Sequence, residues 1–329
     1  MADALILARA LADPTSLALD TDWCGLITMA RAEQLLGTLA WRLDGLPLPE
    51  DVALLLADAR ASAETGRRAA LWEAEMARRA LAPLGCPVVL LKGTAFVAAG
   101  LAAGQGRAIG DLDILVPRAA LDAVEAALLA AGWEWVKPDP YDDAYYRRWM
   151  HELPPLIHRT RDRMIDVHHT ILPLTARVRP DAAALIAGAQ PLGNGLSVLS
   201  PADMLVHAAA HLFADGDLAG GLRNLWDVHC LVGEHGIEGL ETRAGSHGLT
   251  REVARALRLS HRLFATEVPT PFRETRGIDG LYLRRLLARD DWGRPTRPFT
   301  RFVFYVRSHW LRMPPAMLAR HLWTKWRRN

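Results

Sequence analysis

Arg107-Ala-Ile-Gly-Asp-Leu-Asp-Ile-Leu-Val116 is a segment in which apolar and acidic residues alternate. Because the side chains of a β-strand point alternately to its two faces, Asp111 and Asp113 are expected to share one face of a strand whose apolar residues are buried. Two carboxylates so close together repel each other unless a cation lies between them. The pair is therefore a candidate ligand set for Mg²⁺, although solvated acids at an exposed strand end show the same spacing.

A second motif lies upstream of these acids. Val88-Val-Leu-Leu91 is a short apolar run between Pro87 and a glycine, which predicts a buried strand, and Lys92-Gly-Thr94 follows it. The backbone N–H groups of such a turn, the Thr94 hydroxyl and the start of the next helix can bind phosphate. Lys92 is one of only three lysines in a chain that otherwise uses arginine, which indicates a site where a compact ammonium is needed.

The pattern of strands and helices predicts an α+β fold in three parts. Residues 81–195 interleave short strands with helices and are expected to form a small core domain with a mixed sheet. Residues 1–80 have apolar side chains at helical spacing and predict an N-terminal helical lobe. Residues 196–329 predict a C-terminal helical lobe that ends in a basic, aromatic tail, and Ser200 is the expected N-cap of its first helix.

The combined motifs resemble the nucleotidyltransferases of the polymerase β superfamily, in which a strand, a Gly-Gly or Gly-Ser turn and a helix precede Asp-x-Asp or Asp-x-Glu on the next strand. The match is closer to a largely uncharacterised bacterial branch with Lys-Gly at the turn and a final Asp-x-His. The resemblance covers residues 86–172. It rests on three segments, which are Leu90-Leu-Lys-Gly-Thr-Ala-Phe96, the segment from Arg107 to Val116, and Met164-Ile-Asp-Val-His-His-Thr-Ile171.

This resemblance implies the transfer of a nucleoside monophosphate from an NTP to a hydroxyl or phosphate, with release of pyrophosphate. Mg²⁺ or Mn²⁺ would be held by Asp111, Asp113 and a third carboxylate on a neighbouring strand, for which Asp166 is the candidate. An edge acid beside Arg161 and Arg163 is the plain structural alternative for Asp166. The nucleotide would be bound by Lys92, Gly93, Thr94 and Arg107.

The resemblance also implies a peptide, protein or sugar-type acceptor. Five further residues are candidates for its binding: His168, His207, His211, Arg223 and Asp227. Each has a structural alternative. His168 is equally consistent with a hydrogen-bonded structural histidine. The His207 and His211 pair is also consistent with packing or with a metal site. The Arg223 and Asp227 pair is also consistent with an ion pair within one helix.

Charge and composition limit the partners of the chain. Residues 297–329 carry eight basic residues and no acidic one, while the rest of the chain is slightly acidic, and this distribution argues against a nucleic-acid substrate. The arginines of that tail alternate with aromatic residues, which is compatible with peripheral contact with an anionic membrane or with packing on the core. Sparse cysteines and a start without a signal-peptide pattern predict a cytoplasmic protein.

Two alternatives to the nucleotidyltransferase hypothesis remain open at this stage. A protein of the same fold that binds nucleotide and acceptor without turnover would share the motifs. A phosphoryl or pyrophosphoryl transferase would share the metal ligands.

Overall fold

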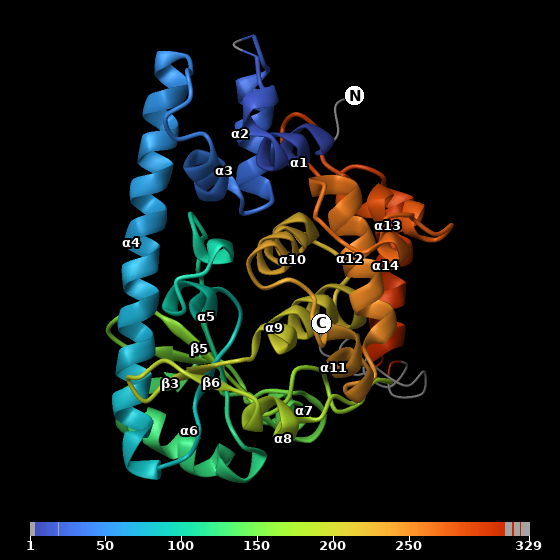
Figure 1. The fold of residues 1–329 in the computed structure, drawn as a ribbon. Helices are drawn as coiled ribbons and strands as arrows, with labels where there is room; N and C mark the ends of the chain where they lie inside the picture. Colours follow the sequence, from blue (N-terminus) through green and yellow to red (C-terminus); the bar gives the residue numbers. More distant parts are fainter. Residues whose placement is uncertain (1–3, 19, 313–317, 319–322, 324–329) are drawn as a thin grey trace.

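The computed structural model describes residues 4–18, 20–312, 318 and 323. Its first part is helical, as expected for the N-terminal lobe. The helices are α1 (Leu5–Ala12), α2 (Trp23–Ala32), α3 (Leu36–Arg42) and α4 (Glu50–Leu81). Helix α4 runs along one side of the molecule, from the other helices of this lobe at one end to the sheet at the other (Figure 1). Acidic residues in its first turn and arginines in its last turn complement the helix dipole over this length.

The core is a seven-stranded sheet. Its strands are β1 (Val89–Leu90), β2 (Leu112–Leu115), β3 (Trp133–Trp135), β4 (Leu156–His158), β5 (Met164–His168), β6 (Gln190–Pro191) and β7 (Ser197–Val198). They are ordered β3-β4-β5-β2-β1-β7-β6. Strand β2 pairs parallel with β5 and antiparallel with β1, while β1 pairs parallel with β7. The sheet is therefore mixed and is flanked by helices, which confirms the expected α+β fold.

Strands β2 and β5 lie at the centre of the sheet, and their register places the predicted acids together. Asp113 is the direct partner of Asp166, and Leu115 is the partner of His168. In parallel strands, paired residues point to the same face, so Asp111, Asp113 and Asp166 share a face. All four residues of β2 are buried, which means that helices and loops cover the acidic face as well as the apolar one.

In the described part of the chain, four α-helices accompany the sheet and six form the C-terminal lobe. The first set is α5 (Lys92–Ala98), α6 (Leu121–Ala130), α7 (Pro140–Trp149) and α8 (Ala182–Ala187). The second set is α9 (Pro201–Ala210), α10 (Gly221–His235), α11 (Leu240–Ser246), α12 (Thr250–Phe264), α13 (Asp279–Leu286) and α14 (Pro298–Arg312). Ser200 caps α9 as predicted, because its hydroxyl accepts a hydrogen bond from the Asp203 N–H.

The helical lobes contact each other as well as the core. Helix α1 packs against α12, so the first and last helical parts of the chain meet (Figure 1). Strand β7 lies just beyond the expected boundary at residue 195 and still belongs to the sheet. The proposed limits 1–80, 81–195 and 196–329 remain a prediction. Among the described residues, no helix combines the length and hydropathy needed to cross a bilayer.

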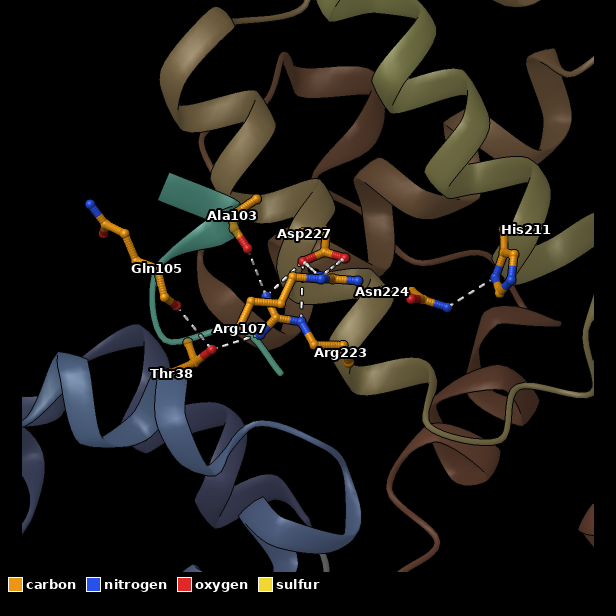
Figure 2. A network of polar contacts seen from close by, with 8 residues as sticks. All are labelled: Thr38, Ala103, Gln105, Arg107, His211, Arg223, Asn224 and Asp227. Carbon is orange, nitrogen blue, oxygen red and sulfur yellow. Dashed lines mark hydrogen bonds and ion pairs between the residues drawn. The ribbon is translucent and has the colours of Figure 1, made fainter. Parts of the chain in front are cut away.

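A buried charge network joins the three parts of the chain (Figure 2). The Asp227 carboxylate on α10 accepts hydrogen bonds from the guanidinium groups of both Arg107 and Arg223. Arg223 also donates to the Thr38 hydroxyl on α3, at 2.6 Å, and to the Ala103 carbonyl. The ion pair predicted within one helix between Arg223 and Asp227 is therefore present, and it forms part of a contact between lobes.

Substitution of Asp227 by Asn tests this network. The change keeps the size of the side chain but leaves two buried guanidinium groups without a carboxylate, so we expect a loss of about 3–5 kcal/mol in the free energy of unfolding, measured by urea denaturation. Glu75→Gln is the matched control, because Glu75 also accepts from two arginines, Arg78 and Arg79, but on the exposed surface of α4. The control should unfold at the wild-type urea concentration, and an equally small effect at Asp227 would contradict the structural role of the network.

Candidate active site

The Asp113 carboxylate is the centre of the candidate site. It is 6% exposed, and its Oδ1 lies 2.6 Å from the Lys92 Nζ and 3.0 Å from the His168 Nε2. Lys92 reaches Asp113 because β1 is the antiparallel neighbour of β2 and ends at Leu90, two residues before Lys92. His168 reaches it from the other neighbour of β2, strand β5. Sheet order thus places a cation and an imidazole on the two sides of one acid.

These contacts set the charge states of the ion pair. Burial opposes the charged form of Asp113, but the Lys92 ammonium and the His168 hydrogen bond outweigh it and hold the pKa of Asp113 well below its usual value. Burial also works against a charged Lys92, and the Asp113 carboxylate outweighs it and raises the pKa of Lys92. The two groups are therefore a fully charged ion pair at neutral pH.

The backbone at Lys92 is strained. Its φ is +50°, in the left-handed region that residues with a Cβ rarely adopt. The next residue, Gly93, lies directly below the Arg107 side chain, whose Nε would be 2.6 Å from an added Cβ. Because Asp227 fixes Arg107, that side chain cannot move aside easily. The turn therefore needs glycine at position 93 and places the Lys92 ammonium on Asp113 at the expense of backbone strain.

The other two predicted acids lack such compensation. Burial raises the pKa of Asp166 to about 7, with additional contributions from the negative charges of Glu152 and Asp113. Partial burial and the charge of Asp113 also raise the pKa of Asp111. Four carboxylates thus act on one another in this part of the sheet, and Lys92 is the cation in contact with Asp113. The donor set fits a divalent cation, which prefers carboxylate oxygen and would neutralise the excess charge.

A pocket lies between α5 and the C-terminal helices. Its polar walls include Lys92, Arg107, Asp227 and the predicted acceptor residues His207 and His211. Apolar residues complete the wall: Leu90, Leu91, Ala95, Phe96, Leu199 and Met204. Its volume is about 30 Å³, and none of the three predicted aspartates is among the described residues that line it.

The structure separates the remaining candidates. Thr94 is buried beneath the turn, and its hydroxyl has no hydrogen-bond partner within the described chain. Arg223 donates hydrogen bonds to Asp227 and Thr38, and it is not among the described residues that line the pocket. Arg107 does line it, although Asp227 engages its guanidinium. His168 lies under Asp113 and is 1% exposed, which agrees with its structural alternative.

Sequence reasoning missed two residues of the site. Glu152 forms an isolated antiparallel bridge with His168, so it lies beside the end of β5 and near Asp166. The preceding residue, His151, stacks its ring on that of His168 with centroids 5.1 Å apart. The loop that carries these two residues has no periodic pattern. The sequence therefore offered no signal beyond the adjacency of a histidine and a glutamate, two residue types that can bind metal ions.

A comparison with known protein families places most of the chain in one of them. A family model described as an uncharacterised nucleotidyltransferase matches residues 20–265, which is more than two thirds of the chain. The match includes every predicted site residue and both sides of the charge network. No curated protein matches the chain.

The opposite pKa shifts of two adjacent acids generate a prediction for the metal-free protein. Because the pKa of Asp166 is raised to about 7, the stability that its protonated carboxyl contributes below about pH 4 is lost as the pH rises through about 7. Asp166→Asn should therefore stabilise the protein at pH 8 by about 2 kcal/mol and by less at pH 5. Asp113→Asn is the matched control with the opposite sign. It breaks a buried ion pair whose stabilisation is lost only in acid, and it should destabilise the protein at pH 8 by about 3 kcal/mol.

Urea denaturation in EDTA at the two pH values measures both effects. Mg²⁺ should remove the advantage of Asp166→Asn, because the wild-type carboxylate then gains a cation. If both variants shift the stability in the same direction at pH 8, the assigned environments of the two acids are wrong.

Proposed function

The chain belongs to the family of uncharacterised nucleotidyltransferases, and we propose that it moves a nucleoside monophosphate from an NTP to an acceptor hydroxyl or phosphate, with release of pyrophosphate. The observation that carries the proposal is the register of β2 and β5. It puts Asp113 opposite Asp166 on one sheet face, with Asp111 two residues away on the same face. An NTP and its divalent cation require such a group of oxygen ligands.

Asp111, Asp113 and Asp166 would hold Mg²⁺ or Mn²⁺. A bound divalent ion supplies charge neutralisation at the phosphates and at the leaving pyrophosphate, and a pair of ions can align the attacking and leaving oxygens. The contribution of the protein is to hold Asp113 ionised and fixed in place. Lys92 and His168 do this from two sides.

Asp166 is the proposed base for the acceptor. In the metal-free protein burial raises the pKa of Asp166 to about 7, and a bound cation would lower this pKa again, so that Asp166 would be an ionised carboxylate able to accept a proton. The carboxylate of Asp166 would take the proton from the attacking acceptor hydroxyl. Glu152 favours this role, because its negative charge makes the Asp166 carboxylate more basic.

Lys92, Gly93, Thr94 and Arg107 remain the proposed nucleotide-binding residues. Lys92 and Arg107 line the pocket and bring positive charge to it, which suits a triphosphate. Gly93 acts through the backbone, since it allows Arg107 to lie across the turn. Buried Thr94 supports the turn from below.

The acceptor is proposed to bind on the C-terminal side of the pocket. His207 and His211 of helix α9 and its extension face it, and Asn224 contacts His211 at 3.2 Å. A peptide, protein or sugar-type acceptor presents the hydroxyls that such groups can bind. Mass spectrometry of candidate acceptors after incubation with mixed NTPs would identify the product. The same measurement separates transfer of the monophosphate from phosphoryl or pyrophosphoryl transfer.

A non-catalytic protein of the same fold is the second candidate. The observation that favours it is the Lys92 ammonium, which already neutralises Asp113 where a metal ligand is expected. Calorimetric titration with Mg²⁺ and each NTP, followed by a pyrophosphate-release assay, distinguishes the two. Binding without release for every acceptor would establish the non-catalytic protein.

Asp111→Asn tests the enzymatic proposal with little effect on the fold. Asp111 is exposed and its pKa is raised, so the substitution relieves repulsion in the protein while it removes a metal ligand. We expect Mg²⁺-dependent pyrophosphate release to fall by about 100-fold or more, with an unchanged urea midpoint. Asp122→Asn, which alters an exposed acid in the first turn of α6, is the control and should keep full activity. Undiminished release by Asp111→Asn would exclude the mechanism.

Peripheral contact with an anionic membrane is the proposed role of the basic tail. Helix α14 exposes Phe299, Phe302 and Trp310 along one stripe, and the surrounding segment carries arginines without any acid. Most of the tail beyond Arg312 lies outside the described residues. The protein should sediment with phosphatidylglycerol vesicles but not with phosphatidylcholine vesicles, and Phe299→Ser/Phe302→Ser should reduce this binding. Equal sedimentation with both lipids, or with neither, would contradict the proposal.

A further inference from the structure

A histidine-rich cluster adjoins the aspartates without including any of them. It consists of His151, Glu152 and His168, whose candidate ligand atoms all lie within 4.8 Å of one another. The Glu152 Oε2 is 3.5 Å from the His168 Nδ1 and 3.6 Å from the His151 Nε2. Two imidazole nitrogens thus converge on one carboxylate oxygen at distances longer than a good hydrogen bond.

The nitrogen of His168 that faces Glu152 lacks a hydrogen bond. The Nε2 on the other side of the ring contacts the Asp113 carboxylate at 3.0 Å. The Nδ1 is buried, has no hydrogen-bond partner in the described chain and faces the Glu152 Oε2 at 3.5 Å. A cation between this nitrogen and the carboxylate would give both a partner.

His151 lies beside both other members of the cluster. Its side chain is mostly covered, its ring centroid is 5.1 Å from that of His168, and its Nε2 faces the Glu152 Oε2. Glu152 brings the negative charge that a dication requires.

We propose that His151, Glu152 and His168 form a second metal site, for a divalent transition-metal ion that favours imidazole nitrogen. Zn²⁺, Co²⁺ and Ni²⁺ belong to this class, and two histidines with one glutamate are a known ligand set for Zn²⁺. Mg²⁺ prefers oxygen and belongs with the aspartates. Three protein ligands leave a coordination position open for water or a substrate oxygen.

The site is connected to the aspartates through His168. Its Nδ1 binds the ion while its Nε2–H donates to Asp113, which is the carboxylate–histidine–metal arrangement that fixes the tautomer and orientation of a ligand histidine. The transition-metal ion therefore holds the hydrogen-bond donor that keeps Asp113 ionised. This connection rests on the proposed function, whereas the binding of the ion does not.

Titration with Co²⁺ tests the site directly. The full chain, treated with EDTA and then saturated with Mg²⁺, is titrated with Co²⁺ while its visible d–d absorption is recorded. We expect one equivalent of Co²⁺ to bind with the intense absorption of a low-coordinate nitrogen and oxygen site, and Zn²⁺ to displace it. His151→Ala and the isosteric Glu152→Gln should each weaken Co²⁺ binding by about tenfold or more.

His211→Ala is the matched control, because it removes an imidazole of the neighbouring pocket that is not part of the cluster. It should bind Co²⁺ as the wild type does. Circular dichroism verifies that each variant is folded. If His151→Ala does not fold, the isosteric Glu152→Gln variant still tests the site. Absence of the absorption in the wild type, or wild-type Co²⁺ affinity in the folded Glu152→Gln variant, would overturn the proposal.

Asp111→Asn separates this proposal from the proposed function. That variant should lose pyrophosphate release and keep the Co²⁺ absorption. If the wild type shows no release with any acceptor and still binds Co²⁺ through the cluster, the nucleotidyltransferase mechanism fails while the metal site stands.

Discussion

A buried carboxylate is stable only when a cation and hydrogen-bond donors accompany it, and the site depends on how this chain meets that requirement at Asp113. The acid lies on the central strand of the sheet, and each neighbouring strand delivers one partner: Lys92 from one side and His168 from the other. The left-handed backbone at Lys92 shows that the fold accepts local strain to obtain this contact. The pKa values of Asp111 and Asp166 are raised instead, and a divalent cation would relieve the cost of their ionised forms.

The lobes around the sheet are connected by the same kind of interaction. The Asp227 carboxylate accepts hydrogen bonds from Arg107 of the core and from Arg223 of its own helix. Arg223 in turn donates a hydrogen bond to Thr38 in the N-terminal lobe. Because Arg107 also covers Gly93, this network fixes the turn that carries Lys92. The wall of the pocket is built from residues of both the core and the C-terminal lobe.

The site is built at the expense of stability by a group of charged and titratable side chains, which are Asp111, Asp166, Glu152 and the two histidines beside them. Strand pairing brings their charges together, and burial, with a further contribution from repulsion between the carboxylates, raises the pKa values of Asp111 and Asp166. Oxygen ligands gather on the β2 side of the cluster and imidazole ligands on the side of the loop before β4. Two ions of different chemistry would each find the ligands that they prefer, with His168 in contact with both groups.

The sequence by itself determined the local part of this arrangement. Alternation of apolar and acidic residues predicted that Asp113 and Asp111 share one face, with Asp113 on β2 and Asp111 just before it. Ser200 was identified as an N-cap, because periodicity and capping depend on neighbours along the chain. The mixed sheet between helical lobes followed from the same patterns together with the resemblance. Apart from the pair of Arg223 and Asp227, the tertiary structure decided which charges meet. Arg107 was expected to bind phosphate, and its guanidinium contacts Asp227, 120 residues away. Glu152 and His151 join the site only because their loop runs beside the end of β5. Such contacts depend on the order in which strands pair and on how the lobes close over them, and no spacing within a single segment encodes that order.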